Sequence, residues 1–579
     1  MQSQIQLSGL LKEITIPANM PDVWGEGALF AFSGMDGETS AVSGFTATFA
    51  SEPYNLLFHL PKRRLLEIHL SLPSQLRVVT NDLLLVQGEM GNLVMTYTAW
   101  HTLVGVLPFA TEMRLKCEDG TYSYFHRPCW VSLDEDKGDV VALNRREDRF
   151  VLAYGSSVEE ALARIEEGFL QDIAAAVQAR LDTYHHLPRL GSPAKNRLLK
   201  KAWSVMRVNT LSAEGVIPQS WSTPDRVPHR WMWLWDSVFH SLAMNHFNPR
   251  LSWEYLKSVL DLQKPDGMIA HFMQPDGKTS GITQPPLLAW GVWENYRIFR
   301  DKRTLEYALP RLERYLEWDV RHRDQNQNGL LEWLIEGDIN CRSGESGMDN
   351  SPRFDQALLL DAVDFSTFAA QDMLYVGMIA AELGQAEKSR AWLERSSKLS
   401  AHIHSDLWDE SDGFYYDRIV DGGWSRVPAV SGFFPLLLPD LLPGRVERLV
   451  KWLQDENHFN AVFPVPSVSL SHRAWSTDMW RGATWINTNY LIILGLRRHG
   501  RQKEAHDLAK KTIEFVSKYY NQYGVLFEFF DARDQLPPVA CDRKGRRREP
   551  YNIRLKMDSI RDYHWTAALV ACLLLEERV

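Results

Sequence analysis

The loop from residue 344 to residue 355, with the sequence GESGMDNSPRFD, is the stretch around which the chain is organised. Two glycines, an asparagine and a proline make it a loop, and helical patterns flank it on both sides. Loops on a rigid scaffold often carry catalytic groups. The simpler interpretation is a surface turn in which Asp349 and Asn350 hydrogen-bond their own backbone. The rest of the chain decides between these two interpretations.

The composition of the chain limits the classes of protein to which it can belong. The chain has 579 residues, of which 45% are hydrophobic and 24% charged, with a net charge of -9. An acidic chain without a clustered basic surface argues against a nucleic-acid partner. The five cysteines are scattered, without a CxxC pair, and the first residues lack the features of a secretory signal. No apolar run approaches 18 residues. We therefore expect a soluble cytoplasmic protein with no membrane partner, whose oligomeric state the sequence leaves open.

The first part of the chain is expected to be β structure. Short apolar runs are separated by Ser, Asn, Asp, Gly and Pro; they cover residues 44–49, 65–70, 76–80, 83–86, 93–97 and 150–154. Such spacing predicts an antiparallel sandwich, which we place at residues 1–155. Residues 156–192 are then predicted to form a linker helix, because apolar residues recur four apart from Ala161 to Val177.

Residues 193–579 show repeated helical patterns. The expected helices are 194–213, 235–246, 251–263, 287–301, 304–321, 364–384, 387–406, 444–454, 486–499, 502–519 and 562–577. Successive hairpins of this kind fit a closed α/α toroid, and no strand–helix alternation suggests a parallel sheet. An α-solenoid is the alternative, but no fixed repeat is visible.

Several loops between these helices combine aromatic rings with polar side chains. Trp235 and Asp236 open one helix, where capping is the simpler role of the acid. Gln284 lies just before the start of another expected helix. Three further residues, Trp480, Arg481 and Trp485, precede the start of a third. Tryptophan beside an acid, an amide or a guanidinium suits a polyol ligand, because rings stack on sugars and these groups bond hydroxyls.

A possible calcium loop lies ahead of the central loop. Asp324, Asn326 and Asn328 occupy alternate positions and are followed by a glycine, with Leu330 offering a carbonyl and Glu332 a carboxylate. The twelfth position of the segment is isoleucine, so the loop is not an EF-hand. An Asx-rich turn explains the same residues without a metal.

Glu528 lies among apolar residues in the segment 524–531, GVLFEFFD. An unpaired charge there would be costly, so the carboxylate is paired, lies on an exposed helix face, or is catalytic with a perturbed pKa. We favour the catalytic interpretation, because Asp349 offers a second carboxylate on a distant loop.

Together these segments resemble glycoside hydrolase family 63, which includes processing α-glucosidases and the smaller mannosylglycerate and glucosylglycerate hydrolases. The resemblance covers roughly residues 195–579. It is carried by ESGMDNSPRFD at 345–355, WDS at 235–237, TQPP at 283–286, WRG at 480–482, FEFFD at 527–531 and DYHWTAA at 562–568. The SGxDNSPR string is specific, whereas the shorter segments occur in other toroid hydrolases.

The resemblance implies an (α/α)6 barrel behind a β-sandwich, and inversion at the anomeric carbon with Asp349 as general acid and Glu528 as general base. Some relatives bind a structural calcium in an Asp/Asn-rich loop, but no cofactor is required. The departures from the family pattern are residues 1–155, which carry no recognisable specificity motif, and the basic run 542–548, DRKGRRR. This run is a solvated loop or a receptor for an anionic aglycone.

The sequence thus predicts an inverting, exo-acting α-glucosidase of an α-linked gluco-oligosaccharide or a small glucoside. The predicted sugar-binding residues are Trp235, Asp236, His271, Gln284, Arg353, Trp480, Arg481 and Trp485. A general acid must be protonated, so the pKa of Asp349 is expected to be raised while Glu528 stays ionised. A non-catalytic sugar-binding protein is one alternative. A sugar epimerase that uses His271 and His564 is another.

Overall fold

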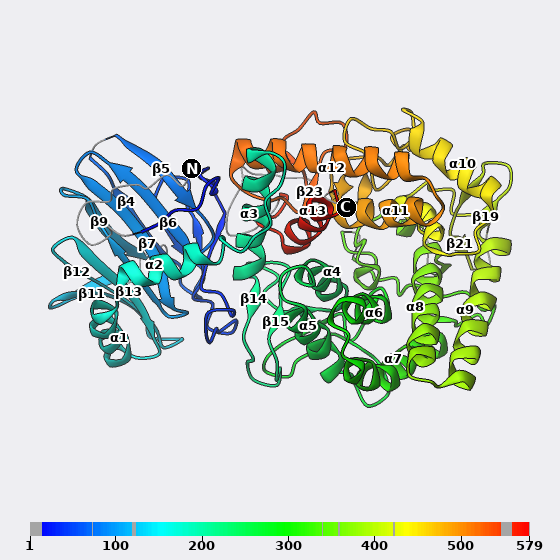
Figure 1. Cartoon of the computed structure of the whole chain (residues 1–579), viewed down its shortest axis with the longest axis horizontal. Coiled ribbons are helices and arrows are strands. Elements are labelled where there is room, and N and C mark those ends of the chain that lie inside the picture. Colours follow the sequence, from blue (N-terminus) through cyan, green and yellow to red (C-terminus); the bar gives the residue numbers. More distant parts are fainter. Residues whose placement is uncertain are drawn as a thin grey trace.

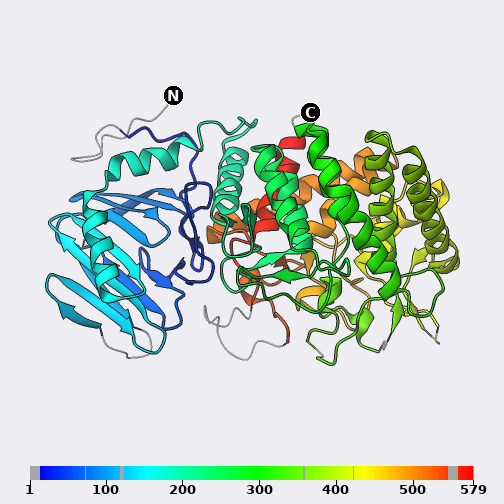
Figure 2. The same cartoon turned by 90° about the horizontal axis from the view of Figure 1, so that it is seen from below.

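The computed structural model describes residues 14–71, 73–117, 123–338, 340–356, 359–420, 423–545 and 558–577. A β domain in blue and cyan lies beside a larger helical domain in green to red (Figures 1 and 2). The expected order, an antiparallel β-sheet domain followed by a helical domain, is confirmed. No helix in these ranges is long and apolar enough to cross a membrane.

Two antiparallel sheets form the N-terminal domain. One has the order β1-β2-β3-β4-β9 and the other β10-β11-β12-β13-β8-β7-β6-β5. The strands are β1 Leu29–Phe30, β2 Ala47–Phe49, β3 Leu56–Phe58, β4 Arg64–His69, β5 Ser74–Val79, β6 Leu83–Gly88, β7 Gly91–Ala99, β8 Thr102–Val106, β9 Glu112–Cys117, β10 Ser123–His126, β11 Cys129–Asp134, β12 Asp139–Arg146 and β13 Arg149–Gly155. Central strands such as β6 and β7 carry runs of buried apolar residues, which form the core between the sheets.

The segment after the sandwich differs from the expected single helix. It forms α1 (Val158–Leu170) and α2 (Ile173–Asp182), with a break between them. Asp172 makes the break, because its side chain accepts a hydrogen bond from the backbone N–H of Ala175 and caps α2. The apolar spacing continues across the break, so periodicity did not reveal it.

The helical domain contains all eleven expected helices, with ends shifted by a few residues. They are α3 Pro193–Val208, α4 Leu234–Met244, α5 Pro249–Asp261, α6 Leu288–Phe299, α7 Lys302–Arg323, α8 Val363–Glu382, α9 Ala386–Asp406, α10 Pro443–Gln454, α11 Ile486–Arg498, α12 Gln502–Tyr523 and α13 His564–Glu576. Helices such as α4 and α13 are buried along their whole length, which is typical of an inner layer.

The inner helices close into a ring. α4 packs on α6, α6 on α8, α11 on α13, and α13 back on α4. The sixth place is taken by a short 3-10 segment, η4 (Val430–Leu437), which packs on both α8 and α11. Pro435 within η4 lacks the backbone N–H that an α-helix needs. Within the described ranges, the toroid therefore has six inner elements, of which five are α-helices.

Inner helices begin on the side of the toroid where short strand pairs gather. β16 (Met232–Trp233) leads into α4 and pairs with β17 (Phe272–Met273). β22 (Thr484–Trp485) leads into α11 and pairs with β23 (Phe529–Phe530). The remaining short pairs are β14 Thr210–Leu211 with β15 Trp221–Ser222, β18 Leu360–Asp361 with β21 Arg418–Ile419, and β19 Trp408–Asp409 with β20 Phe414–Tyr415. The positive ends of α4, α11 and α13 thus face the loops that carry the candidate site.

Candidate active site

A cavity of about 200 Å³ opens at this end of the toroid. It brings together seven of the predicted residues: Trp235, Asp236, His271, Gln284, Asp349, Trp480 and Trp485. Glu528, from the segment before β23, lines the same cavity although it lies 179 positions after Asp349 in the sequence. The fold therefore places both predicted catalytic carboxylates on one small cavity.

The loop that carries Asp349 is held by its own backbone and by Trp235. It contains the 3-10 turns η2 (Gly344–Ser346) and η3 (Pro352–Phe354). Gly347 has a φ of 70°, and a Cβ at this position would lie 2.4 Å from the Trp235 ring. A glycine is needed there because both the left-handed backbone and the close approach of the ring exclude a side chain.

Asp349 forms an ion pair with Lys544, whose Nζ lies 2.7 Å from Oδ2. Burial alone would raise the pKa of Asp349, but the charges of Lys544 and the neighbouring Arg543 hold it below its usual value. The expectation of a raised pKa is therefore wrong, because these two positive charges favour the ionised form of Asp349.

Glu528 is 2% exposed and pairs with Arg543. The Arg543 Nε donates to Oε2 at 3.1 Å, and the backbone N–H of Ile560 donates to the same oxygen at 3.3 Å. The backbone N–H of Glu528 donates to the Ile560 carbonyl at 2.8 Å. The burial expected from the apolar neighbours is thus present, and an arginine compensates the charge.

Consecutive residues of one loop therefore bind the two carboxylates, Arg543 on Glu528 and Lys544 on Asp349. The Asp478 carboxylate fixes this loop by accepting the backbone N–H groups of Lys544 at 2.9 Å and Gly545 at 2.8 Å. The remaining arginines of the predicted basic run, Arg546, Arg547 and Arg548, lie outside the described residues. Within the described part of the run, Arg543 and Lys544 line the cavity, so this part does more than form a solvated loop.

Asp236 and His271 line the cavity with polar side chains. Within the described residues, Asp236 Oδ1 and His271 Nδ1 are buried and lack a hydrogen-bond partner. Burial raises the pKa of Asp236 well above its usual value, and the charge of Glu528 adds to the effect. Burial lowers the pKa of His271 to about 4, so the imidazole is neutral at pH 7. Both side chains line the cavity, where an acid and an imidazole are groups that can bond sugar hydroxyls.

Tryptophan rings form one wall of the cavity. Trp480 and Trp485 stack with centroids 3.7 Å apart, and Trp565 meets the rings of Trp235 and Trp485 edge-on. Gln284 lines the cavity too, but its Oε1 accepts the backbone N–H of Trp235 at 3.2 Å. Gln284 thus helps to cap α4 and is not as free as expected.

The two arginines predicted to bind sugar do not line the cavity. Arg353 is fully buried and pairs with Asp364 at 2.6 Å and Asp417 at 3.1 Å. Arg481 forms two hydrogen bonds with Asp355, at 2.9 and 2.7 Å. A buried guanidinium needs carboxylate partners, so both arginines hold the loops together. Arg353 cannot reach a ligand in this conformation.

Sequence reasoning missed several residues that line the cavity. His229, Glu336, Cys341, Tyr563 and Trp565 belong to this group. His229 Nδ1 lies 2.8 Å from Asp225 Oδ2, and its Nε2 lies 3.3 Å from Arg543. The only sequence signal for it was its position just before the tryptophan-rich stretch at 231–235. His564, needed for the epimerase alternative, does not line the cavity; it stacks on His240 in the core.

The predicted calcium loop is closed by N–H donors. Glu332 accepts the backbone N–H groups of Gln325 and Asn326 at 2.7 and 3.2 Å. The side-chain amides of Asn326 and Asn328 donate to Asp361. Among the residues that the structure describes, Asp324 Oδ1 has no hydrogen-bond partner and is buried. The described ranges contain no group of three or more His, Cys, Asp or Glu residues that could hold a metal, so the donor set fits an Asx-rich turn better.

Calcium in this loop stays a prediction with a direct test. If the metal binds, excess chelator should lower the Tm, because a ligand that binds only the native state stabilises it by mass action. The Leu330 carbonyl and Glu332 would then be among the ligands. Melting curves with and without chelator, beside elemental analysis, check it. An unchanged Tm in metal-free protein contradicts calcium binding.

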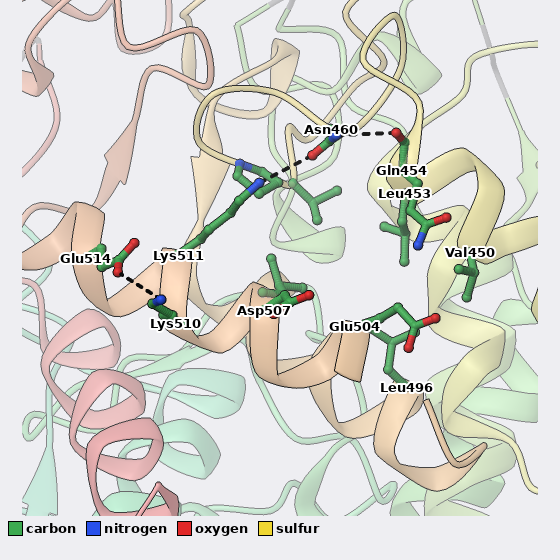
Figure 3. Close-up of a pocket in the computed structure, with 13 residues that line it drawn as sticks. Val450, Leu453, Gln454, Asn460, Leu496, Glu504, Asp507, Lys510, Lys511 and Glu514 are labelled. Carbon is green, nitrogen blue, oxygen red and sulfur yellow. Dashed lines mark hydrogen bonds and ion pairs between the residues drawn. The ribbon is translucent and has the colours of Figure 1, made fainter. Parts of the chain in front are cut away.

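A second hollow, of about 350 Å³, lies between α10 and α12 (Figure 3). Its floor is apolar, and its rim carries charged side chains. Among them are Lys510 and Glu514, whose Nζ and Oε1 atoms are 3.9 Å apart. The residues that line it include no aromatic ring. The smaller cavity at the end of the toroid is therefore the candidate active site.

Comparisons with known proteins match most of the helical domain. A family model described as "Mannosylglycerate hydrolase MGH1-like glycoside hydrolase domain" matches residues 229–566. The mannosylglycerate hydrolase of Thermus thermophilus is 25% identical over 405 residues, covering 55% of this chain and 94% of that protein. An uncharacterized protein of Borreliella burgdorferi is 28% identical over 233 residues, which is 40% of this chain and 47% of that protein.

Solved structures show the same fold. The GH63 mannosylglycerate hydrolase from Thermus thermophilus, in complex with Tris and D-glycerate, superimposes with a TM-score of 0.53 at 23% identity. That match covers all of that chain and 66% of this one. A bacterial glucoamylase complexed with acarbose, 12% identical, gives 0.57 and covers 96% of both chains. The whole architecture therefore has a counterpart among the (α/α)6 glycosidases.

Proposed function

This chain belongs to glycoside hydrolase family 63, with a domain of the MGH1-like type, and on that premise we propose that it is an inverting α-glycosidase of the α-glucosidase type. One observation carries the proposal: Asp349 and Glu528 reach one tryptophan-walled cavity from separate loops. Inverting glycosidases need one carboxylic acid and one carboxylate on opposite faces of the sugar, about 6.5–9.5 Å apart. The small size of the cavity, about 200 Å³, supports exo action on a terminal sugar.

Each carboxylate has a distinct task in this reaction. Protonated Asp349 gives its proton to the glycosidic oxygen as the bond to the anomeric carbon breaks. Glu528 takes a proton from a water molecule as the water oxygen bonds to the opposite face of that carbon. An α-linked substrate then yields the β-anomer and a free aglycone alcohol. Proton exchange with solvent returns both groups to their starting states.

The ion pair between Lys544 and Asp349 bears on the aglycone. A general acid cannot act while an ammonium keeps it ionised. A carboxylate on the aglycone competes for Lys544, and its negative charge beside Asp349 favours the protonated acid. We therefore favour a small α-glycoside with an anionic aglycone over a neutral oligosaccharide. Glycerate, named in the mannosylglycerate hydrolase relatives, is an aglycone of this kind.

A substrate panel tests the function. Glucosylglycerate, mannosylglycerate and neutral α-linked disaccharides are incubated with the protein, and the first anomer released is followed by NMR. We expect the β-anomer to appear first and the glycerate substrates to give the highest kcat/KM. Initial release of the α-anomer would rule out inversion, and no hydrolysis of any α-glycoside would leave a sugar-binding protein.

Lys544→Met keeps most of the length of the side chain and removes its charge. We expect the KM for glycerate substrates to rise about tenfold or more, since charge-assisted pairs contribute about 1.5–3 kcal/mol. The pKa of Asp349 should also rise, because burial is then opposed by less positive charge. Activity on neutral substrates should therefore persist to higher pH than in the wild type.

The matched control is Lys510→Met, which removes the same charge on α12 at the second hollow (Figure 3). It should leave all kinetic constants unchanged. Equal losses on glycerate and neutral substrates in Lys544→Met would show that Lys544 does not bind the aglycone.

A further inference from the structure

A fully buried carboxylate, Asp562, joins the two domains just behind the candidate site. From the N-terminal domain, the backbone N–H of Leu29 and the side-chain Nδ2 of Asn81 donate to Oδ2 at 3.1 and 2.6 Å. From the helical domain, Lys201 Nζ lies 2.9 Å from Oδ1, and the backbone N–H of Leu526 donates to the same oxygen at 3.1 Å. The carboxylate is thus bound from both domains.

The backbone of Asp562 needs these contacts. Its φ of 53° lies in the left-handed region, which residues other than glycine adopt when their surroundings fix them. The side-chain bonds to Leu29, Asn81, Lys201 and Leu526 supply that constraint. Removal of one donor is therefore expected to free the turn as well as the side chain.

The turn at Asp562 is part of the support of Glu528. Residues 526–528 and 560–563 run antiparallel: the backbone N–H of Tyr563 donates to the Leu526 carbonyl at 3.0 Å, and that of Glu528 to the Ile560 carbonyl at 2.8 Å. Ile560 also donates to the Glu528 carboxylate. Asp562 is two residues after Ile560 in the sequence. Leu526, whose backbone N–H donates to the Asp562 carboxylate, is two residues before Glu528. A shift of Asp562 would therefore move both Ile560 and Glu528, the two residues that form this contact.

Asn81 is the N-terminal domain's side chain in this network. It lies in the turn between β5 and β6 and is 0% exposed. Its Nδ2 donates to Asp562 and to the Leu29 carbonyl, and its Oδ1 accepts from Lys201 at 3.1 Å and from Ser204 at 2.8 Å. An amide is required, because one end must donate to a carboxylate while the other accepts from an ammonium.

We propose that Asn81 is a positioning residue that holds the Glu528 carboxylate in place through Asp562, so that the N-terminal domain completes the active site. The inference rests on the proposed role of Glu528 as base. A base must be held within about 0.5 Å of its productive position, and a misplacement of about 1 Å can cost roughly 100-fold in rate. A contact that only docked the two domains would affect stability and leave kcat unchanged.

The test compares Asn81→Ala with a control at the same domain interface. Thr39→Val removes the hydroxyl that accepts the backbone N–H of Ser212 at 2.9 Å, also between the two domains, without touching Asp562. We expect Asn81→Ala to lower kcat about 10- to 100-fold with KM within about threefold. Thr39→Val should keep the wild-type kcat. Melting temperatures are measured first, and assays run well below the lower one.

Wild-type kcat in folded Asn81→Ala, with the same loss of Tm as Thr39→Val, would overturn the inference. If Asn81→Ala does not fold, Asn81→Asp decides. It keeps the size of the side chain and an acceptor for Lys201 and Ser204 but replaces the donor to Asp562 by an oxygen, so an unchanged kcat overturns the proposal. Glu528→Gln is assayed in parallel. If that variant remains active, the proposed base is wrong. If it is inactive while Asn81→Ala is fully active, only the present inference fails.

Discussion

Replacement of Glu528 by glutamine is expected to abolish nearly all turnover, by about 10²- to 10⁴-fold for the loss of a general base. The loss should be the same for natural substrates and for activated glycosyl fluorides. A good leaving group removes the need for an acid but not the need to deprotonate water. Steady-state kinetics on both substrate classes check this.

The Glu528 variant loses its ion pair with the largely buried Arg543, so its Tm is measured beside its activity. Asp534→Asn is the matched control, because Asp534 lies in the same segment but pairs with Lys518 away from the cavity. It should retain wild-type turnover. Turnover of the fluoride at the wild-type rate by Glu528→Gln would contradict the assignment of the base.

Replacement of Asp349 by asparagine should lower turnover of natural substrates by a similar factor of about 10²–10⁴. Here the class of substrate matters. A fluoride or an aryl glycoside with a good leaving group needs little protonation, so Asp349→Asn should regain part of its rate on it. The ratio of rates on the two substrate classes therefore separates the acid from the base. Fold and binding should be largely kept, since the side chain keeps its size.

The other carboxylates of the same loop provide the controls. Asp355 pairs with Arg481, and Glu345 accepts from Arg323 and from the backbone N–H groups of Thr283 and Leu334. Neither lines the cavity, so Asp355→Asn should keep turnover. Wild-type turnover of a natural substrate by Asp349→Asn would show that the acid is misassigned.

The sequence by itself indicated the secondary-structure elements and supplied the candidate sugar-binding residues. Apolar spacing predicted eleven helices, because helix geometry repeats every 3.6 residues and each helix buries one face. Short apolar runs between turn residues predicted six of the strands of the N-terminal domain, namely β2, β4, β5, β6, β7 and β13. The composition of the loops indicated sugar binding at Trp235, Asp236 and Trp485, which line the cavity. Signals of this kind arise within one segment, so a single sequence carries them.

The apolar periodicity failed to predict two features, the break at Asp172 and the short element η4. Asp172 caps a new helix within a continuous apolar stripe, so one predicted linker helix is two. The sixth inner element, η4, was not predicted, because eight residues with an internal proline give no helical pattern. The break at Asp172 is a local cap, whereas η4 is held by its packing against α8 and α11.

Only the tertiary structure decided which charges meet. Arg353 stands in the most specific motif, yet it binds Asp364 and Asp417 and not the ligand cavity. Lys544 and Arg543 come from a run that looked solvent-exposed, yet they reach Asp349 and Glu528. Asn81 meets Asp562 across 481 positions of sequence. A buried charge must find a partner because desolvation is costly, but the partner is whichever group the fold brings within reach, and a sequence pattern does not contain that distance.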